Sequence, residues 1–426
     1  MKRIYLIIGV VALAVIALAA WWFFSRSQLI PAAPGTAGSL PGIGIPSIGF
    51  SGGNGQPGSS QGSQNGVGTG TPGQPIGKNF GIVSNETVLN YFVSASNSAV
   101  TIQPDGKIEQ ISSGQSTYLS SSAISGIISA EFSYDGKRVL VGFGNQASPQ
   151  WSVFDIDKKA WTPLPMNPAV AAWSPYDYQI AYFAAASGAN ALETIDLANS
   201  KAKPKILVSF PNQDFGILWA SSSTIFLSDR SNALFSGSIL AINPKTGILS
   251  SVVQSRVGLE ARWNAGGTLG IILAGTRLGR GGSLGIIDNA GNLVHEISFL
   301  TFPSKCVFPP LATTTLQAPP SAITVVSGTA LRATTTTVAL SKPSPSVICG
   351  VPRNASALSN GQLPDAYDEM RIMTSDDIYQ IGLADGKVTP VFNDPLQGLD
   401  VSNVKFFNGA VFFVNRYDQK LYAISL

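Results

Sequence analysis

The stretch that decides the fold is Ala130-Glu-Phe-Ser-Tyr-Asp-Gly-Lys-Arg-Val-Leu-Val-Gly-Phe143, because imperfect copies of it return down the chain. Its aromatic anchor, Phe132, is matched by Trp173, Trp219 and Trp263 at spacings of 41, 46 and 44 residues. This period is typical of four-stranded propeller blades and is too long for leucine-rich or ankyrin repeats. The other copies span residues 171–182, 216–227, 261–272 and 404–413.

Each anchor phrase is followed by a second hairpin of short apolar strands, in which apolar and polar positions alternate. Turn pairs such as Asp135-Gly136 supply the positive φ angles that tight hairpins need. The other turn pairs are Asp105-Gly106, Asp385-Gly386 and Asn408-Gly409. Counting these units predicts an all-β, seven-bladed propeller over residues 80–426, with six blades as the alternative.

The predicted last blade, residues 401–426, is one strand short. Residues 80–83, Phe80-Gly-Ile-Val, are the natural fourth strand, since pairing the two ends would remove an open sheet edge.

The Phe-Ser-x-Asp-Gly repeat resembles the TolB-like family of WD-repeat-like propellers from about residue 80 to the end. The resemblance implies a propeller used for protein contacts. The pattern departs at Trp219, where Ser replaces Asp-Gly, and at Trp263, where Gly-Gly does.

The front of the chain predicts an export address. Lys2 and Arg3 precede an uncharged run over 4–24, which is long enough to cross a bilayer as a helix. The charges around it favour an inside N-terminus and an outside body, so we expect a signal anchor over 1–27. A cleaved signal is the alternative, since Ala17-Leu-Ala19 has the form of a processing site. Residues 28–79 are rich in Gly, Pro and Ser and predict a flexible, disordered linker.

The two cysteines, Cys306 and Cys349, lie in strand-like runs that we interpret as the first two strands of the sixth blade. Export and adjacent strands predict a disulfide, and two buried thiols are the alternative. The Thr- and Pro-rich residues between them, 309–346, cannot form a core and predict a disordered surface loop, with a glycan-bearing or partner-binding arm as the alternative. With two thiols and one distant histidine we expect no metal site.

Other candidates for chemistry are weak. His295 is the only histidine, falls in a predicted outer strand and lacks a Gly-x-Ser-x-Gly partner, so it does not indicate a Ser-His-Asp hydrolase. The glycine-rich residues 275–285 join two predicted strands and lack the ending of a phosphate-binding loop. No cofactor is expected.

The residues just before the anchor aromatics belong to innermost strands, which converge on one axis. Glu131, Arg262 and Lys405 are therefore candidate polar contacts at the mouth of the channel, and a structural charge pair is the alternative. The 27 basic and 24 acidic residues form no blocks, so a nucleic-acid partner is not indicated.

Together these features predict a single-pass protein of the cell membrane whose extracytoplasmic propeller binds an envelope or cell-surface protein or polymer. A structural component of a surface or secretion assembly is one alternative. A propeller-type glycan hydrolase or lyase is another and would need paired carboxylates at one cleft. Acidic residues are sparse and mostly in turns, so we expect no enzyme.

Overall fold

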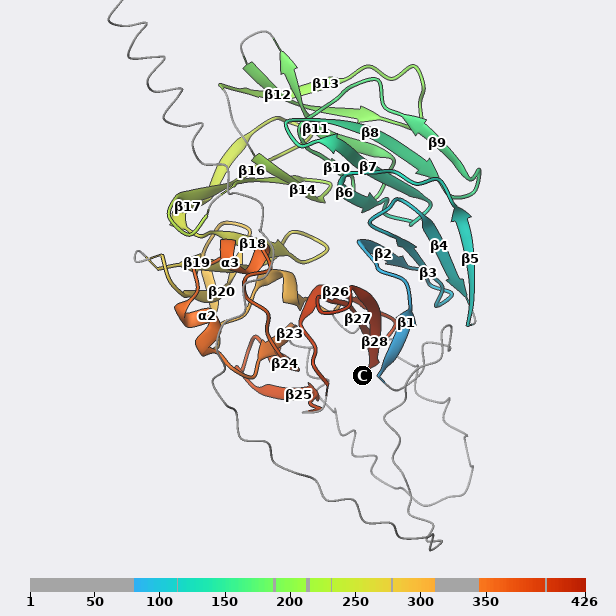
Figure 1. Cartoon of the computed structure of the whole chain (residues 1–426). Coiled ribbons are helices and arrows are strands. Elements are labelled where there is room, and N and C mark those ends of the chain that lie inside the picture. The colour runs from blue at the N-terminus through green and yellow to red at the C-terminus, as the bar shows by residue number, and fades with distance from the viewer. Residues whose placement is uncertain are drawn as a thin grey trace, which may run out of the picture. The chain divides into compact units, whose positions relative to one another are not determined.

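Seven four-stranded antiparallel sheets stand around a common centre in the computed structural model (Figure 1). The structure describes residues 80–112, 114–186, 189–211, 215–230, 232–276, 279–310, 345–394 and 397–426. Seven sheets confirm the predicted all-β, seven-bladed propeller and rule out six blades. The predicted anchor and linker, residues 1–79, lie outside the described residues.

In the first six blades the four strands follow each other in the chain, from the channel outward. Blade 1 consists of β2 (Asn90–Val93), β3 (Ala99–Ile102), β4 (Ile108–Ser112) and β5 (Gln115–Ser120). Blade 2 consists of β6 (Ile127–Phe132), β7 (Arg138–Asn145), β8 (Ser148–Asp155) and β9 (Ala160–Pro163). Blade 3 consists of β10 (Ala171–Trp173), β11 (Gln179–Ala186), β12 (Ala189–Asp196) and β13 (Lys205–Phe210).

The next three blades repeat this order. Blade 4 consists of β14 (Phe215–Ser221), β15 (Thr224–Asp229), β16 (Ser236–Ile242) and β17 (Leu249–Val257). Blade 5 consists of β18 (Glu260–Trp263), β19 (Leu269–Gly275), β20 (Gly282–Asp288) and β21 (Leu293–Ile297). Blade 6 consists of β22 (Cys306–Val307), β23 (Ser346–Pro352), β24 (Asp376–Gly382) and β25 (Val388–Phe392), and a short helix η1 (Pro303–Lys305) precedes it.

Blade 7 is built from both ends of the propeller. It consists of β26 (Val401–Phe407), β27 (Ala410–Asn415), β28 (Lys420–Ser425) and, as its outermost strand, β1 (Gly81–Ser84). Strand β1 pairs antiparallel with β28, with Gly81 opposite Ala423. The ring of Phe80 stacks on Tyr422 at 5.4 Å. The predicted closure is therefore confirmed, and the pairing covers the edge that β28 would otherwise expose.

The four aromatic anchors hold consecutive blades together. Phe132 contacts Phe92 of blade 1 with ring centroids 6.2 Å apart, and Trp219 meets Tyr176 of blade 3 at 6.5 Å. Trp263 stacks on Phe226 of blade 4 at 3.8 Å. Trp173 instead donates its indole N–H to the Glu131 carbonyl of blade 2 at 3.1 Å. The aromatic residues repeat in the sequence because each one contacts the preceding blade.

Gly136 shows why the turn of the founding phrase needs glycine. Its φ is +71°, a backbone conformation that residues with a Cβ rarely adopt. A Cβ at this position would also lie 2.1 Å from Cδ1 of Phe92 in the preceding blade. The turn residue therefore serves both the hairpin and the interface between blades 1 and 2.

Blade 6 carries the two departures from the repeat. Cys306 lies opposite Cys349 on β22 and β23, and the two form a disulfide, as predicted. Between β23 and β24 the chain leaves the blade in two short helices, α2 (Ser356–Asn360) and α3 (Asp365–Asp368). Most of the predicted insert, residues 311–344, lies outside the described residues, and Ser346 at its end already begins β23.

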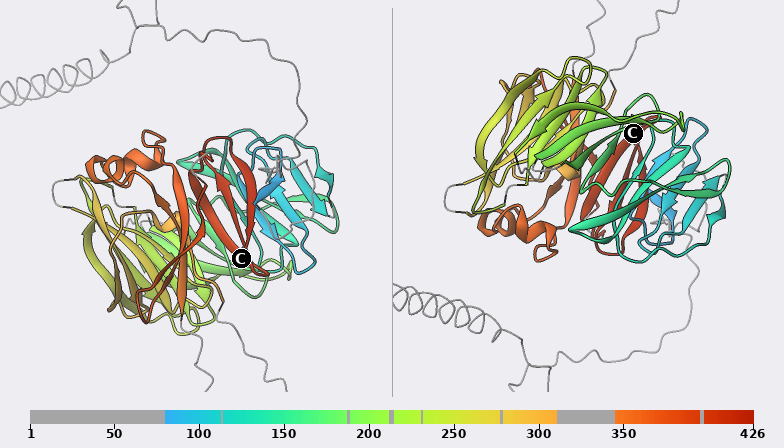
Figure 2. Two further views of the ribbon diagram at one scale, coloured as in Figure 1. Left: turned by 90° about the horizontal axis from the view of Figure 1, so that it is seen from below. Right: turned by 90° about the horizontal axis from the view of Figure 1, so that it is seen from above.

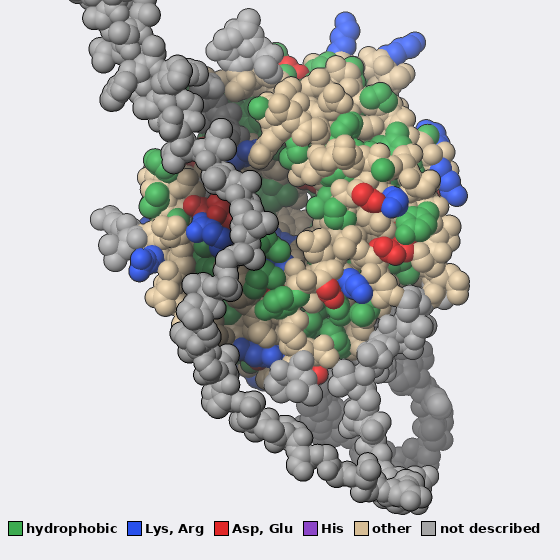
Figure 3. All heavy atoms as spheres, viewed as in Figure 1, with side chains coloured by type: hydrophobic (Ala, Val, Ile, Leu, Met, Phe, Trp, Pro, Cys, Tyr) green, Lys and Arg blue, Asp and Glu red, His purple; other side chains and the backbone are tan. Residues whose placement is uncertain are grey.

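Edge-on views place α2 and α3 on the opposite side of the ring from the C-terminus (Figure 2). In the space-filling view the ring is hollowed at its centre, and charged side chains on the visible face are single or in pairs of opposite sign (Figure 3). No helix within the described residues has the length and apolar character needed to span a bilayer.

Candidate functional site

The three candidate residues all lie on innermost strands, Glu131 on β6, Arg262 on β18 and Lys405 on β26. Each is half-buried. Their charges act on one another, since both Arg262 and Glu131 shift the pKa of Lys405. The structure therefore brings the three side chains together in the channel. Their role as contacts to a ligand stays a prediction.

Lys405 is held by blade 1. Its ammonium donates to Oδ1 of Asn90 at 2.9 Å and to the Tyr91 carbonyl, and it lies 4.5 Å from the centre of the Tyr91 ring. Burial, and then the positive charge of Arg262, lowers the pKa of Lys405 to about 7, while the charge of Glu131 acts in the opposite direction.

Arg262 bridges blades 5, 6 and 7. Its guanidinium donates to the Ser304 carbonyl at 3.0 Å and to the Val404 carbonyl. Both acceptors are neutral, and burial lowers the pKa of Arg262 from its usual high value. The third residue, Glu131, has its pKa raised to about 7 by burial, although a hydrogen bond from the Trp173 backbone and the Lys405 charge act to lower it.

A pocket of about 670 Å³ opens at the mouth of the channel where the innermost strands begin. Strands β15 and β18, the segment before β22, α3 and β26 all contribute to it, so four blades form its wall. We call it the acidic pocket, because three carboxylates line it beside two arginines. These charged residues are Asp229, Arg230, Glu260, Arg262 and Asp368.

The carboxyl groups of Glu260 and Asp368 both line the acidic pocket, and each affects the pKa of the other. Glu260 is half-buried at the start of β18, and Asp368 is exposed at the end of α3. Burial, then the charge and hydrogen bond of Asp368 and the charge of Asp365, raises the pKa of Glu260 to about 8. The Asp368 side chain is exposed as a whole, but its carboxyl group has lost part of its surrounding water, and this raises its pKa. Because two adjacent carboxylates repel each other, ionisation of both groups at once is disfavoured.

Helix α3 is held in place from two sides, which fixes Asp368 in the pocket. The Tyr367 ring stacks on Phe302 at 3.8 Å and packs against the Arg416 guanidinium at 3.6 Å on blade 7. On the other side, the carboxylate of Asp365 accepts a hydrogen bond from the Ala233 amide of blade 4 at 3.2 Å.

Beneath α3 lies a fully buried ionic network. The Lys305 ammonium contacts a carboxylate oxygen of Asp376 and one of Asp400, each at 2.6 Å, and all three side chains have no exposed surface. Arg416 contacts the second oxygen of Asp400 at 3.0 Å. Two cations balance two carboxylates, so the network satisfies the requirement that buried charges be paired. It joins blades 6 and 7 below the acidic pocket.

A second pocket, of about 740 Å³, lies at the other mouth, where the innermost strands end. We call it the aromatic pocket, after Trp263, Phe308 and Phe406 in its wall. Arg262 lines both this pocket and the acidic pocket, so it connects the two mouths.

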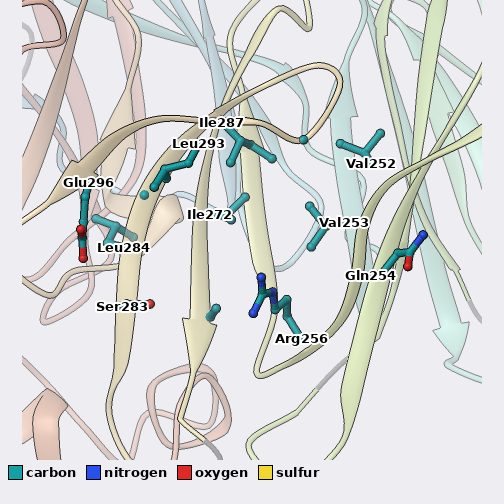
Figure 4. Close-up of a pocket in the computed structure, with 13 residues that line it drawn as sticks. Val252, Val253, Gln254, Arg256, Ile272, Ser283, Leu284, Ile287, Leu293 and Glu296 are labelled. Carbon is teal, nitrogen blue, oxygen red and sulfur yellow. The ribbon is translucent and has the colours of Figure 1, made fainter.

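A third hollow lies away from the channel, between blades 4 and 5 (Figure 4). Its volume is about 420 Å³, and apolar side chains of β17 and of blade 5 face each other across it. Val252, Ile272 and Leu284 are typical of its lining. This apolar lining is that of a crevice between two packed blades.

The remaining sequence candidates fall where they were expected. His295 lies on β21, the outer strand of blade 5, and the glycine-rich residues 275–285 join β19 and β20. Within the described ranges, no cluster of three or more His, Cys, Asp or Glu side chains is placed to hold a metal ion.

No protein-family model matches the chain, and no curated protein matches it. Among solved structures it is similar to the β-propeller domain of Cps50 (Swd1) from Myceliophteria thermophila, with 10% identity, 82% of this chain and 99% of that chain covered, and a TM-score of 0.48. It is also similar to the β-propeller domain of the trilobed protease from Pyrococcus furiosus, with 10% identity, 79% of this chain and 95% of that chain covered, and a TM-score of 0.46. Virginiamycin B lyase from Staphylococcus aureus is similar with 12% identity, 80% of this chain and 96% of that chain covered, and a TM-score of 0.46. These likenesses concern the fold alone.

Sequence reasoning missed the carboxyl pair of Glu260 and Asp368. Glu260 directly precedes the anchor copy that begins at residue 261, and its place at the start of an innermost strand was a usable signal. Asp368 gave none, because the segment between β23 and β24 has no counterpart in the other units.

Proposed function

We propose that the chain is a binding module whose protein partner docks over the acidic pocket. One observation carries this proposal: the interacting carboxyl groups of Glu260 and Asp368 line one pocket that four blades form. A propeller fold suits a protein-binding module, since loops from successive blades converge on one mouth. The fixed position of α3 means that the pocket needs no rearrangement before a partner binds.

A basic side chain of the partner is the group that this pocket suits. A lysine or arginine of the partner would displace a proton held by Glu260 or Asp368. It would then bind both carboxylates at once through charge-assisted hydrogen bonds. Arg230 and Arg262 would exclude a second cation beside it. Capture of the partner should therefore release a proton and should strengthen as the pH rises through the pKa of the pair.

The test is capture of partners from an extract of the source cells, followed by mass spectrometry. A Glu260→Gln and Asp368→Asn double variant should lose the proteins that the wild type captures. The matched control is Glu369→Gln, because Glu369 is next to Asp368 but pairs with the exposed Arg371 at 2.6 Å. Unchanged capture by the double variant, at equal folding, would contradict a role for the pocket.

The same pair bears on the glycan-active alternative. Glycoside hydrolases hold their two carboxyl groups about 5–5.5 Å apart when retaining and about 6.5–9.5 Å apart when inverting. The separation of the Glu260 and Asp368 carboxyl groups would therefore distinguish a retaining pair, an inverting pair and a pair that only binds.

The predicted anchor adds a location to the proposal. The apolar run 4–24 and the linker 28–79 would tether the propeller outside the cell membrane, where an envelope or cell-surface protein is the partner. Protease added to intact cells should then release the propeller by cleaving within 28–79. Cleavage only after lysis would place the propeller inside. Copurification of a fixed, stoichiometric complex would instead favour the structural-component alternative.

A further inference from the structure

The aromatic pocket lies at the far mouth of the channel from the carboxyl pair. Strand β18 begins at Glu260 in the acidic pocket and ends at Trp263 in the aromatic pocket. Strands β18 and β26 both face the centre of the ring (Figure 1). Arg262 and Lys405 of these strands line the aromatic pocket together with Trp263, Phe308 and Phe406.

Arg262 and Lys405 are the two charged residues of this pocket, and both are cations. Every acceptor that they contact is neutral: the carbonyls of Ser304, Val404 and Tyr91, and the amide oxygen of Asn90. Among the residues that the structure describes, neither cation pairs directly with a carboxylate. Partly buried charges are normally balanced by an opposite charge nearby, and here no carboxylate of the described residues is in direct contact with either cation.

Nearby groups compensate for these charges only in part. Glu131 is the acid whose charge acts on Lys405, but the two side chains make no direct ion pair, and burial raises the pKa of Glu131 as it lowers the pKa of Lys405. The Arg262 charge in turn lowers the pKa of Lys405.

We propose that the aromatic pocket binds an organic carboxylate, with the carboxylate between Arg262 and Lys405 and an apolar body against Trp263, Phe308 and Phe406. A planar guanidinium and an ammonium both bind carboxylates strongly, and the carboxylate would complete the charge balance of the channel. The apolar walls favour a ligand such as an apolar peptide C-terminus over a polar sugar acid. This site is separate from the acidic pocket, so either proposal can fail alone.

The first experiment compares two probes that differ only in charge. N-acetylphenylalanine and its carboxamide share the same aromatic body, and their binding to the purified propeller can be measured by calorimetry and by tryptophan fluorescence. The acid should bind at least about tenfold more tightly than the amide, since a charge-assisted contact is lost. Equal binding, or no binding of the acid at millimolar concentration, would overturn the proposal. Tighter binding of inorganic phosphate or of polygalacturonate would overturn it as well, because neither fills the apolar walls.

Variants test the role of the Lys405 charge. Lys405→Gln should weaken binding of the acid about tenfold or more, and Lys405→Arg should largely restore it. Arg256→Gln is the matched control, since Arg256 lines the crevice between blades 4 and 5 and not the channel. Thermal unfolding establishes that each variant is folded. If Lys405→Gln and Arg256→Gln bind the acid equally, the carboxylate does not lie at Lys405.

Discussion

Glu260 on β18 and Asp368 in α3 place two carboxyl groups in the same pocket, where each affects the pKa of the other, although 107 residues separate them in the chain. The innermost strand of blade 5 supplies one carboxyl group, and an excursion from blade 6 supplies the other. The repeat thus fixes the position of Glu260 on an innermost strand. The two helices inserted between β23 and β24, which the other blades lack, bring Asp368 beside it. Because the two carboxyl groups come from different blades, the candidate site is the pocket between the blades and not a single blade.

A proton bound to the Glu260 carboxyl group in the folded state should make the free energy of unfolding depend on pH. The pKa of Glu260 is raised from its ordinary value near 4.5 to about 8, so the folded state binds a proton that the unfolded state releases. Stability from this group is therefore present below about pH 4.5 and is lost as the pH rises through about 8. Glu260→Gln should remove that loss, and denaturant unfolding at several pH values would show it as a smaller decline than in the wild type. An identical pH dependence in the two proteins would mean that the pair holds no proton.

The buried network of Lys305 should be a major contributor to stability. Lys305→Met leaves Asp376 and Asp400 with one cation instead of two in a fully buried site, and loss of one partner of such a network costs about 3–5 kcal/mol. Urea unfolding measures the change. Lys137→Met is the control, because Lys137 pairs with Asp157 at the exposed surface, and it should leave the unfolding midpoint unchanged. Equal effects would show that the network is not buried as described.

The disulfide should stabilise the propeller by about 3–4 kcal/mol in the chain-entropy model, because it closes a loop between residues 43 apart. Reductant should therefore lower the unfolding midpoint of the wild type. A Cys306→Ala and Cys349→Ala double variant should already be less stable and should no longer respond to reductant. A wild type that is equally stable with and without reductant would contradict this expectation.

The closing strand should be indispensable, while the residues before it should not. Removing residues 1–79 keeps β1, its pairing with β28 and the stacking of Phe80 on Tyr422. Removing residues 1–84 deletes that strand and exposes the edge of β28, so the melting temperature should fall by several degrees and the protein should self-associate. Thermal unfolding and light scattering on the two truncations give the comparison. Equal behaviour would show that blade 7 is stable with three strands.

Periodic features of the chain were predictable from sequence, and solitary features were not. The anchors Phe132 and Trp263 repeat because each blade packs on the preceding one in the same way, so blade number and ring closure follow from spacing. The pairing of Cys306 with Cys349 was predictable because both occupy the first hairpin of one repeat. Asp368 lies outside any repeat, so its approach to Glu260 depends on tertiary contacts of α3 alone.

The buried network was hidden for a related reason. Asp376 and Asp400 lie at the beginning of a strand and just before one, where acidic residues usually serve turns in water. Tertiary contacts with Lys305 and Arg416 remove them from solvent, and no local sequence pattern predicts this burial. The candidate residues Glu131 and Lys405 were predictable because their positions just before the anchors place them on innermost strands.

Site-specific photocrosslinking in intact cells tests the central claim, that a partner docks over the acidic pocket. A photoreactive phenylalanine analogue at Ser304, which lines this pocket, is compared with the same analogue at Thr162 on β9, an exposed outer strand. The docking proposal predicts a discrete adduct from Ser304 that is absent from Thr162 and that disappears when Glu260→Gln and Asp368→Asn are added. The same adduct from both positions, or an adduct from Thr162 alone, would contradict docking at the mouth of the channel.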